Sequence, residues 1–509
     1  MGKRRSIFEE SILLSLFSVT LQVLGLLFNI FLTKHLGAAS VGVLTLMGSF
    51  YSLAAVLSGG SGFLATSRFI SEEIGCCGNP HRVFVYSLRF CLLLSISSTV
   101  LLILTAPLTA SLISGKGVMP SAVRVLCLSL PLSALNACLK GRCYAYHRVY
   151  VPAIAECAEF ILRSGMLAFC TVFLIPQGHI TLLTAFSLSM LAGQGIALLF
   201  LMTIRFPNIQ KAGRCMPFIQ FLRLLLPMIG NASLVALLSS VNDALVPLTL
   251  LQYGQSPHEA LAQFGSFEAI ILPTLFFPSV YQCCMSGLLV PDLSRARSVG
   301  DIKAVRQMTE RVLEQTVEYA LPVVLILALF GRQIGLLLGG DAFTGTVLCC
   351  MAPVVPLIYL EIIMEAVLRG LGKQSISSLV YIVEYLVRIS VLLVCVPLFG
   401  FYGIVVSYMA CNLTGNSVRL FFVLRLTGLR PFWSRLILRP AFSLLLSWQL
   451  TALLMLLIRR FLSNRLMQIV LFGTVCVAVY LFTLRAAACL SDSKSTEDGN
   501  RYKSFSALF

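Results

Sequence analysis

Long apolar runs, separated by short connections, occupy almost the whole chain. Each run has about 20 residues or more, the length that a helix needs to cross the hydrocarbon core of a membrane. With charges, Gly and Pro as boundaries, the pattern predicts an all-α polytopic membrane protein with about fourteen spans. The predicted spans are 11–33, 42–66, 83–107, 119–139, 151–175, 181–203, 224–251, 263–290, 317–338, 344–368, 375–399, 402–424, 436–458 and 466–488.

Composition supports this interpretation. Hydrophobic residues make up 58% of the 509 positions and charged residues only 12%, which excludes an ordinary soluble globule and a disordered chain. Most of the 17 cysteines lie inside apolar runs, where Cys behaves as a small hydrophobic residue. Adjacent cysteines such as Cys283 and Cys284 lack the Cys-x-x-Cys spacing of zinc sites. We expect no metal and no cofactor.

Lys and Arg are distributed unevenly among the connections. With the N-terminus inside, 27 of the 38 fall in inner segments, 7 in outer segments and 4 within spans. Positive residues collect on the cytoplasmic side, so we expect a cell-membrane protein with both termini in the cytoplasm. The net charge of +17 then reflects topology rather than nucleic-acid binding. The outer loop with Arg459, Arg460 and Arg465 departs from this rule.

The connection from Asp292 to Glu318 differs from the others because charged residues alternate with apolar ones at helical spacing. Such a segment is typical of an amphipathic helix on the membrane surface. A helical extension of the next span into water explains the pattern equally well.

An internal repeat is visible at a fixed distance. Glu159 and Arg163 recur as Glu384 and Arg388, 225 positions later. Gly42 and Gly265 (223 apart), and the pairs Ser67-Arg68 and Ser294-Arg295 (227 apart), repeat at nearly the same offset. Two parallel halves of six helices are therefore expected, as in alternating-access transporters. The predicted parts are a first lobe at 1–204, a cytoplasmic linker at 205–223, a second lobe at 224–425, two extra spans at 426–490 and a disordered cytoplasmic tail at 491–509.

Several motifs resemble one family of membrane proteins. They are Phe31-Leu-Thr-Lys-His-Leu-Gly37, Val41-Gly42, Gly62-Phe-Leu-Ala-Thr-Ser-Arg68, Glu72-Glu73, Phe264-Gly265 with Pro273, Leu289-Val-Pro-Asp-Leu-Ser294 and Leu368-Arg-Gly-Leu-Gly-Lys373. Together they resemble the stage V sporulation protein B-like polysaccharide exporters. These belong to the multidrug, oligosaccharidyl-lipid and polysaccharide exporter superfamily, which includes lipid II flippases. The resemblance implies two six-helix bundles plus two helices, and movement of lipid-linked sugars across the cytoplasmic membrane. The segment from Cys143 to His147 departs from the family pattern.

Four ionisable residues form two predicted pairs within spans. Glu159 and Arg163 are four positions apart, as are Glu384 and Arg388, so each pair can neutralise itself on one helical face. We interpret them as structural ion pairs, while contact of the arginines with a substrate phosphate is the alternative.

Two acids have no basic residue within one helical turn. Asp243 and Glu268 are therefore candidate ion-coupling sites, unless both face a wet cavity and titrate normally. Among amides, Gln22, Asn29 and Asn231 suit interhelical hydrogen bonds, with sugar binding, above all by Asn29, as the alternative.

Prolines within spans 7 and 8 interrupt backbone hydrogen bonding. Pro247, Pro273 and Pro278 therefore favour bending, and a hinge is one use of it.

Arg68 and Arg295 lie at the predicted inner ends of equivalent spans. Arg suits bidentate binding of a pyrophosphate, so both are candidate substrate-binding residues. The alternative is that they are ordinary positive-inside charges near anionic headgroups.

Two transport functions fit the sequence. The first is a flippase for lipid-linked oligosaccharide or cell-wall precursors, acting as a monomer in polysaccharide, cell-wall or spore synthesis. The second is an ion-coupled multidrug or cation antiporter of the same superfamily. A membrane enzyme such as a sugar polymerase is disfavoured because the outer loops are short and nearly uncharged, and no catalytic set is visible.

Overall fold

The computed structural model describes residues 7–60, 62–75, 79–107, 120–146, 148–204, 206, 217–429, 434–458 and 471–484. Within these ranges the regular elements are all helices. Eleven of the described helical segments are long and apolar enough to cross a membrane. The predicted all-α polytopic class is confirmed.

The first six predicted spans correspond to the N-terminal group of helices, α1 to α9. The predicted span 42–66 is divided at a kink, where Gly59 takes a φ of +100° that favours glycine. The elements are α1 (Ile7–Leu36), α2 (Ala38–Ala55), the π-helix η1 (Val56–Gly60), α3 (Gly62–Gly75), α4 (Pro80–Leu104), α6 (Pro120–Cys127), α7 (Ser129–Ala145), α8 (Tyr150–Phe169), the π-helix η3 (Cys170–Leu174) and α9 (Leu182–Met202).

The next six form the C-terminal group, α10 to α18. Predicted span 8 stays helical throughout but changes from π to α to 3-10 geometry around Pro273 and Pro278, whereas α10 continues through Pro247 as one α-helix. The elements are α10 (Phe218–Gln252), α11 (Pro257–Ser266), the π-helix η4 (Phe267–Ile271), α12 (Leu272–Phe276), the 3-10 helix η5 (Phe277–Ser279), α13 (Val280–Ser298), α14 (Ile302–Leu337), α15 (Ala342–Met351), the 3-10 helix η6 (Ala352–Val354), α16 (Val355–Gly370), α17 (Gln374–Phe399) and α18 (Phe401–Thr427).

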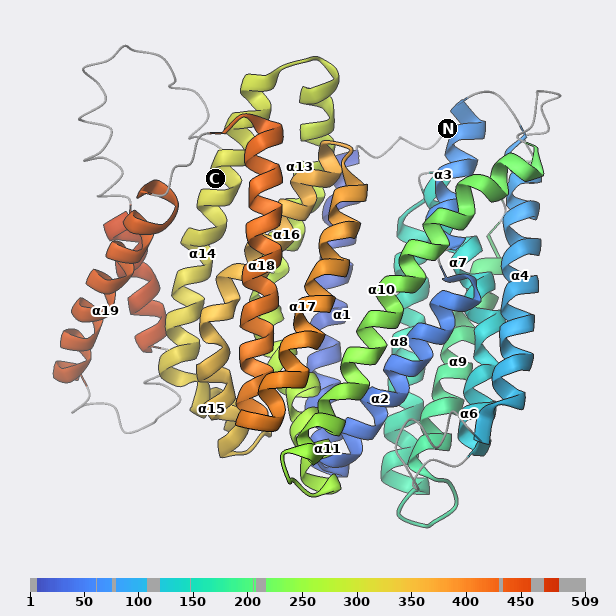
Figure 1. Ribbon diagram of the computed structural model, residues 1–509, viewed down its shortest axis with the longest axis horizontal. Coiled ribbons are helices and arrows are strands. Elements are labelled where there is room, and N and C mark those ends of the chain that lie inside the picture. Colours follow the sequence, from blue (N-terminus) through green and yellow to red (C-terminus); the bar gives the residue numbers. More distant parts are fainter. Residues whose placement is uncertain are drawn as a thin grey trace.

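The connection at 292–318 is a helical extension and not a separate surface helix. α13 continues to Ser298, Gly300 turns the chain with a φ of +77°, and α14 then runs for 36 residues from Ile302. Asp301 caps α14 by accepting a hydrogen bond from the Ala304 amide at 2.9 Å. The two helices form an antiparallel hairpin that rises above its neighbours (Figure 1).

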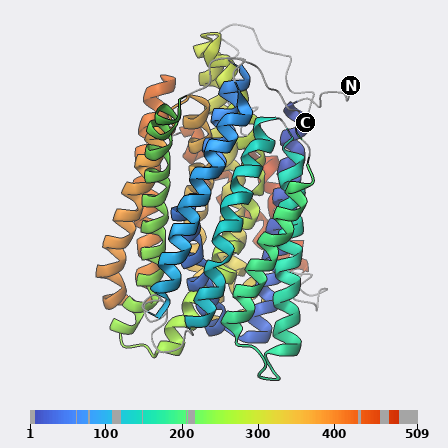
Figure 2. The same cartoon turned by 90° about the vertical axis from the view of Figure 1, so that its right-hand side faces the viewer.

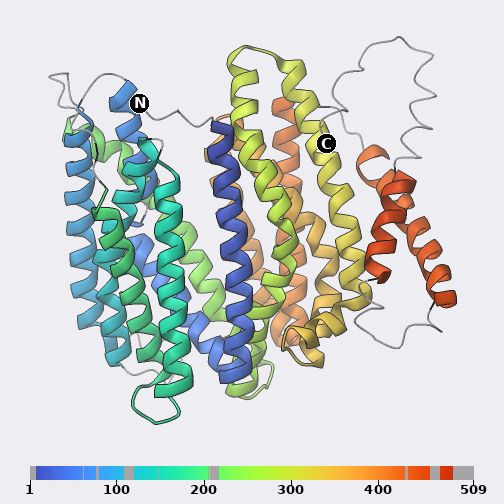
Figure 3. The ribbon, with the colours of Figure 1, turned by 180° about the vertical axis from the view of Figure 1, so that it is seen from behind.

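The two groups stand side by side, and α1 lies between them (Figures 1 and 3). α1 packs against α8 of its own group and against α13 of the other, while α10 packs against both α2 and α17. Each group has its own apolar core, with Met47, Leu126 and Leu130 in one and Phe264 and Tyr359 in the other. The halves therefore meet mainly through α1, α2, α10 and α11.

The ends of the helices agree with the predicted alternation. The ends of α3, α7, α13 and α16, and the starts of the α-helices that follow them, lie at one end, which we call the inner end (Figures 1 and 2). The turns from α10 to α11, α14 to α15 and α17 to α18 lie at the opposite, outer end. That the inner end faces the cytoplasm stays a prediction. Lys3, Lys211, Arg214, Arg459 and the tail from 491 lie outside the described residues.

The last two predicted spans correspond to shorter helices beside α14. η7 (Ser434–Leu438) leads into α19 (Arg439–Ile458), which packs against α14, and a further helix covers Leu471–Leu484. Phe472 in this last helix contacts Phe330 of α14, with ring centroids 5.2 Å apart.

Candidate functional site

The internal repeat places two similar side-chain clusters inside the two groups. In the N-terminal triad, Gln194 of α9 donates from Nε2 to Glu159 Oε1 of α8 at 2.7 Å. Asn136 of α7 donates from Nδ2 to Gln194 Oε1 at 2.8 Å. The triad therefore ties three helices together with one carboxylate and two neutral amides.

The C-terminal triad consists of Glu361 of α16, Glu384 of α17 and Arg419 of α18, each 225 positions after its counterpart. Arg419 is fully buried and donates to Glu384 from both terminal guanidinium nitrogens. Nη1 donates to Oε1, and Nη2 donates to Oε2 at 2.7 Å. Its Nη2 also lies 3.4 Å from Glu361 Oε1. Here the three equivalent helices, α16 to α18, are joined by two carboxylates around one guanidinium.

The second predicted ion pair, between Glu384 and Arg388, is wrong, because Glu384 has a different partner. Glu384 binds Arg419 from the neighbouring helix, because a bidentate fork across α17 and α18 satisfies both carboxylate oxygens. Arg388 stacks its guanidinium on Tyr408 instead, with Cζ 3.3 Å from the ring centroid. This is a cation–π contact with an aromatic ring of α18.

The first predicted ion pair is present but weak. Arg163 Nη1 lies 4.0 Å from Glu159 Oε1, at the limit for an ion pair, and also contacts Met190 Sδ at 3.8 Å. Glu159 is shared with Lys140 of α7, whose Nζ lies 3.7 Å from Oε2 and 3.1 Å from Glu156 Oε1. Lys140 thus supplies the positive charge that the spacing assigned to Arg163 alone.

Each cluster borders a cavity. The N-terminal cavity, of about 490 Å³, lies beside α1. Its lining contains charges of both signs and is formed by Leu21, Gln22, Lys140, Glu156, Glu159, Phe160 and Arg163.

The C-terminal cavity, of about 180 Å³, is smaller and more aromatic. Its polar lining includes Glu361, Tyr381, Glu384, Tyr385, Arg388 and Tyr408. The predicted residues Glu384 and Arg388 therefore face the same space and interact electrostatically, although no ion pair joins them.

The two candidate ion-coupling acids both lie near Arg388, the base that the sequence spacing assigned to Glu384. Arg388 of α17 interacts electrostatically with Asp243 of α10 and with Glu268 of η4. Asp243 Oδ2 also accepts a hydrogen bond from Ser49 Oγ of α2 at 2.7 Å. This bond joins the C-terminal group to the N-terminal group.

Of the amides, Asn29 forms an interhelical hydrogen bond. Its Nδ2 donates to the Ala269 carbonyl at 3.3 Å and so ties α1 to the π-helix η4. Gln22 lines the N-terminal cavity.

Arg68 and Arg295 lie apart from both clusters, at the inner ends of α3 and α13. Arg68 is exposed and pairs with Glu72, Nε to Oε1 at 2.9 Å. Arg295 is also exposed. Neither is among the residues that line the two cavities.

At the outer end, α2 crosses α11 with almost no space between the backbones. A Cβ atom on Gly42 would collide with the Leu261 carbonyl oxygen, and one on Gly265 would collide with the Ala38 carbonyl oxygen. Gly42 and Gly265 are the glycines that repeat in the sequence, so the repeat places them at one contact between the groups.

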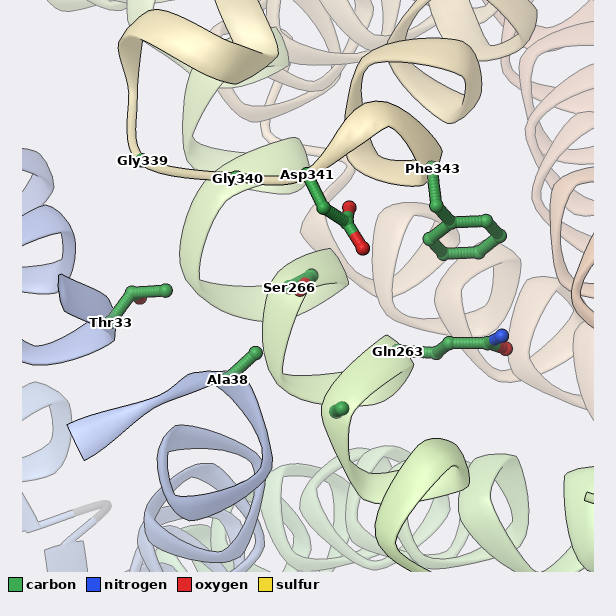
Figure 4. Close-up of a pocket in the computed structure, with 9 residues that line it drawn as sticks. Thr33, Ala38, Gln263, Ser266, Gly339, Gly340, Asp341 and Phe343 are labelled. Carbon is green, nitrogen blue, oxygen red and sulfur yellow. The ribbon is translucent and has the colours of Figure 1, made fainter. Parts of the chain in front are cut away.

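A cavity of about 240 Å³, the outer cavity, adjoins this crossing (Figure 4). Thr33 and Ala38 contribute to it from the N-terminal group, and Gln263, Ser266 and Asp341 from the C-terminal group. Asp341 points toward Ser266 across the space. The outer cavity therefore straddles both groups at the place where they touch most closely.

Comparisons with known proteins agree with this arrangement. No protein-family model matches the chain. Stage V sporulation protein B of Bacillus subtilis (strain 168) is 23% identical over 419 residues, which cover 79% of this chain and 80% of that protein. The resemblance to that family is confirmed.

Solved structures show the same fold. The lipid II flippase MurJ, in an inward closed conformation, has a TM-score of 0.67 at 14% identity and covers 96% of this chain and 99% of its own. An inward-facing multidrug resistance MATE family transporter of the MOP superfamily has a TM-score of 0.63 at 17% identity, with 80% and 94% covered. The chain has the fold of these transporters.

Sequence reasoning missed Lys140, Gln194, Glu361 and Arg419. The signal that finds them is the offset of 225 itself, because adding it to Asn136 and Gln194 gives Glu361 and Arg419. Applied to Lys140, it gives Glu365, a change of sign between the two groups.

Proposed function

We propose that the protein flips a lipid-linked precursor, a polyprenyl-pyrophosphate oligosaccharide or cell-wall unit, across the cytoplasmic membrane by alternating access. The observation that carries this proposal is the N-terminal cavity beside α1. Lys140 and Arg163 provide positive charge for phosphate, while Glu156 and Glu159 provide acceptors for sugar hydroxyls.

The proposed path begins at the inner end. Arg68 and Arg295 are exposed there, where they meet the pyrophosphate first, and the head group then moves to Arg163 and Lys140. The lipid tail stays in the bilayer, because its transfer into a polar cavity would expose apolar surface. Asn29 joins α1 to η4 through its hydrogen bond to the Ala269 carbonyl. In this proposal it lies at the edge of the substrate path.

The lobes at 1–204 and 224–425 are proposed to move about the contacts between α2, α10 and α11. In this proposal the crossing of α2 and α11 at Gly42 and Gly265, where the two helices approach closely, closes the outer end. Opening that end must separate α2 from α11, and it strains the bond between Ser49 and Asp243. A cation or proton at Asp243 or Glu268 weakens the attraction of these acids for Arg388, which supplies a route for ion coupling.

The alternative, an ion-coupled multidrug or cation antiporter, has one observation in its favour. The lining of the C-terminal cavity contains two acids, Glu361 and Glu384, and one base, Arg388, which also interacts electrostatically with Asp243 and Glu268. Acids therefore outnumber this base. A cationic substrate suits such a site. We favour the flippase because the N-terminal cavity has as many bases as acids, Lys140 and Arg163 among them, whereas Arg388 is the single base in the lining of the C-terminal cavity.

Transport assays in proteoliposomes separate the two functions. Wild type is expected to flip a fluorescent polyprenyl-pyrophosphate sugar, and Arg163→Ala to lower the initial rate about tenfold, since a charged hydrogen bond contributes about 1.5–3 kcal/mol. Arg68→Ala should reduce the rate more than Arg68→Lys if the contact is bidentate. Arg369→Gln, at an exposed base outside both cavities, is the matched control.

Export of a cationic dye by the wild type, without flipping of the lipid, would refute the flippase and support the antiporter. Equal flipping by wild type, Arg163→Ala and Arg68→Ala would remove these arginines from the path.

A further inference from the structure

A basic cavity at the inner end of the C-terminal group has no role in the transport path. It measures about 190 Å³ and lies where the α13–α14 turn, the α16–α17 turn and the end of α18 meet. Its lining consists of Arg297, Gly300, Ile302, Val305, Leu371, Lys373 and Leu426.

Tight packing below the basic cavity fixes its shape. Ser294 Oγ of α13 donates to the Gly370 carbonyl at the end of α16, at 3.0 Å. A Cβ on Gly370 would lie 2.9 Å from Leu293 Cβ, so glycine lets the two helices approach. Ser294 and Gly370 belong to two of the sequence motifs that resemble the exporter family, and the structure joins those motifs here.

Arg297 extends across the α16–α17 turn. Its Nη1 lies 3.2 Å from the position that a Cβ on Gly372 would occupy, and Gly372 has a φ of +64°. Glycine at this position therefore both permits the turn and leaves space for the guanidinium. Lys373 follows directly and lines the same cavity.

The two bases of the basic cavity are not neutralised within the part of the chain that the structure describes. Arg297 and Lys373 are exposed and form no ion pair there, whereas nearby Arg369 pairs with Glu365 at 3.8 Å. Asp301, the acid next to Gly300, is engaged as the cap of α14.

The start of α17 adds partial positive charge to the same place. α17 begins at Gln374, and its N-cap residue Lys373 makes no side-chain capping hydrogen bond. Amide groups in the first turn of a helix lack intrahelical partners and attract anions. Two side-chain cations and a helix start thus converge on one cavity, which indicates an anionic ligand.

The apolar residues around the basic cavity indicate where that ligand comes from. Ile302 is 71% exposed and Val299, in the adjoining turn, is 79% exposed. Exposed aliphatic side chains beside two bases fit the interface between lipid headgroups and acyl chains. A soluble anion would use the bases but not the aliphatic residues.

We propose that the basic cavity binds the phosphate of an anionic phospholipid from the inner leaflet. Arg297 and Lys373 hold the phosphate, the first turn of α17 donates to it, and Ile302 and Leu426 contact the glycerol and upper acyl carbons. The bound lipid joins the α13–α14 hairpin to the α16–α17 turn. This proposal does not depend on the substrate that the protein transports.

Native mass spectrometry of the purified protein tests the proposal. Wild type in detergent is titrated with phosphatidylglycerol, with phosphatidylcholine of the same acyl chains and with undecaprenyl phosphate. Arg297→Gln and Lys373→Gln should each weaken retention of phosphatidylglycerol about fivefold, since one basic residue near an anionic surface contributes about 1 kcal/mol. Lys303→Gln, an exposed base on the same hairpin outside the cavity lining, is the charge-matched control.

The outcomes separate the sources of phosphate. Preference for phosphatidylglycerol over phosphatidylcholine, reduced by the two cavity variants and not by Lys303→Gln, supports the site. Equal losses in all three variants would show diffuse surface charge and overturn it. Binding of undecaprenyl phosphate alone would overturn the phospholipid assignment, as would equal retention of both phospholipids by the wild type. Lys373→Gln changes an exposed side chain, so it keeps the test valid if Arg297→Gln misfolds.

Discussion

The two triads occupy equivalent helices but differ in charge. The N-terminal triad holds Glu159 with two amides, and Lys140 balances its charge from one turn away on α7. The C-terminal triad surrounds a fully buried Arg419 with two carboxylates. One repeated geometry is thus held together by amide hydrogen bonds around one carboxylate in one half and by ion pairs around one guanidinium in the other. Helix packing in this fold is therefore compatible with either chemistry.

The largest difference between the triads should appear when the central residue is removed. Arg419→Leu leaves two buried carboxylates unpaired and should destabilise the protein by about 3–5 kcal/mol. Gln194→Leu removes two side-chain hydrogen bonds, one of them to the Glu159 carboxylate, and should cost about 1–3 kcal/mol. The measurement is the fraction of monodisperse protein left after heating in detergent. Equal losses for the two variants would contradict the comparison.

The C-terminal triad should tolerate replacement of its residues by those of the N-terminal triad. Glu361→Asn, Glu365→Lys and Arg419→Gln together reproduce Asn136, Lys140 and Gln194 at the equivalent positions. This triple variant should recover most of the thermal stability that Arg419→Leu loses, because replacing a complete buried ion cluster is often neutral. A double variant without Glu365→Lys should recover less, since Glu384 then lacks a positive partner. Stability no better than that of Arg419→Leu in the triple variant would show that the two sites are not equivalent.

At the crossing of α2 and α11, each half contributes one glycine, Gly42 or Gly265, that lets the helices approach closely. Gly265→Val should force α2 and α11 apart, because its side chain meets the Ala38 carbonyl, and Gly42→Val should do the same from the other side. In a Cys-free background, both changes should raise labelling of a cysteine at Thr33 by an impermeant maleimide several-fold. Gly25→Val is the control, because a Cβ there has no neighbour within 4 Å. Unchanged labelling would remove this crossing from the closure of the outer end.

The smallest predicted effects concern the two repeated arginines. Arg163 is partly exposed and only weakly paired, so Arg163→Ala should change the free energy of unfolding by about 1 kcal/mol or less. Arg388→Ala should lower folded yield more, and Asp243→Asn or Glu268→Gln should restore it better than Glu384→Gln, which has Arg419 as its partner. Yields from fluorescence size-exclusion chromatography measure this order. Better rescue by Glu384→Gln would re-establish the pairing expected from sequence spacing.

The all-helical class and the internal repeat could be predicted from the sequence, because both depend on patterns along the chain. Apolar runs of membrane-spanning length predicted the helices, and the offset of 225 led to Glu159 and Glu384 at equivalent places in α8 and α17. Pro273 and Pro278 also predicted a disturbance of span 8, where the helix changes from π to α to 3-10 geometry, since proline has no amide hydrogen to donate. Pro247 did not, because α10 continues through it.

The partners of individual side chains were harder to predict, because they lie on other helices. The spacing of four positions favoured Arg388 for Glu384, yet the bidentate geometry of Arg419 on α18 satisfies that carboxylate better. The same limit applied to Asp243 and Glu268, whose neighbour Arg388 lies on another helix. No local sequence pattern indicates the distance between side chains on different helices.

The sequence by itself determined the membrane class, the order of the spans, the parallel repeat and the unequal distribution of basic residues between the two ends. These depend on hydrophobic length, helical period and charge counts, which neighbouring residues specify. Tertiary structure alone decided which acid meets which base, that Gly42 meets Gly265, and that Arg297 and Lys373 share a cavity. Those contacts depend on how helices far apart in the chain cross, and the crossing is set by the packing of whole surfaces rather than by any one segment.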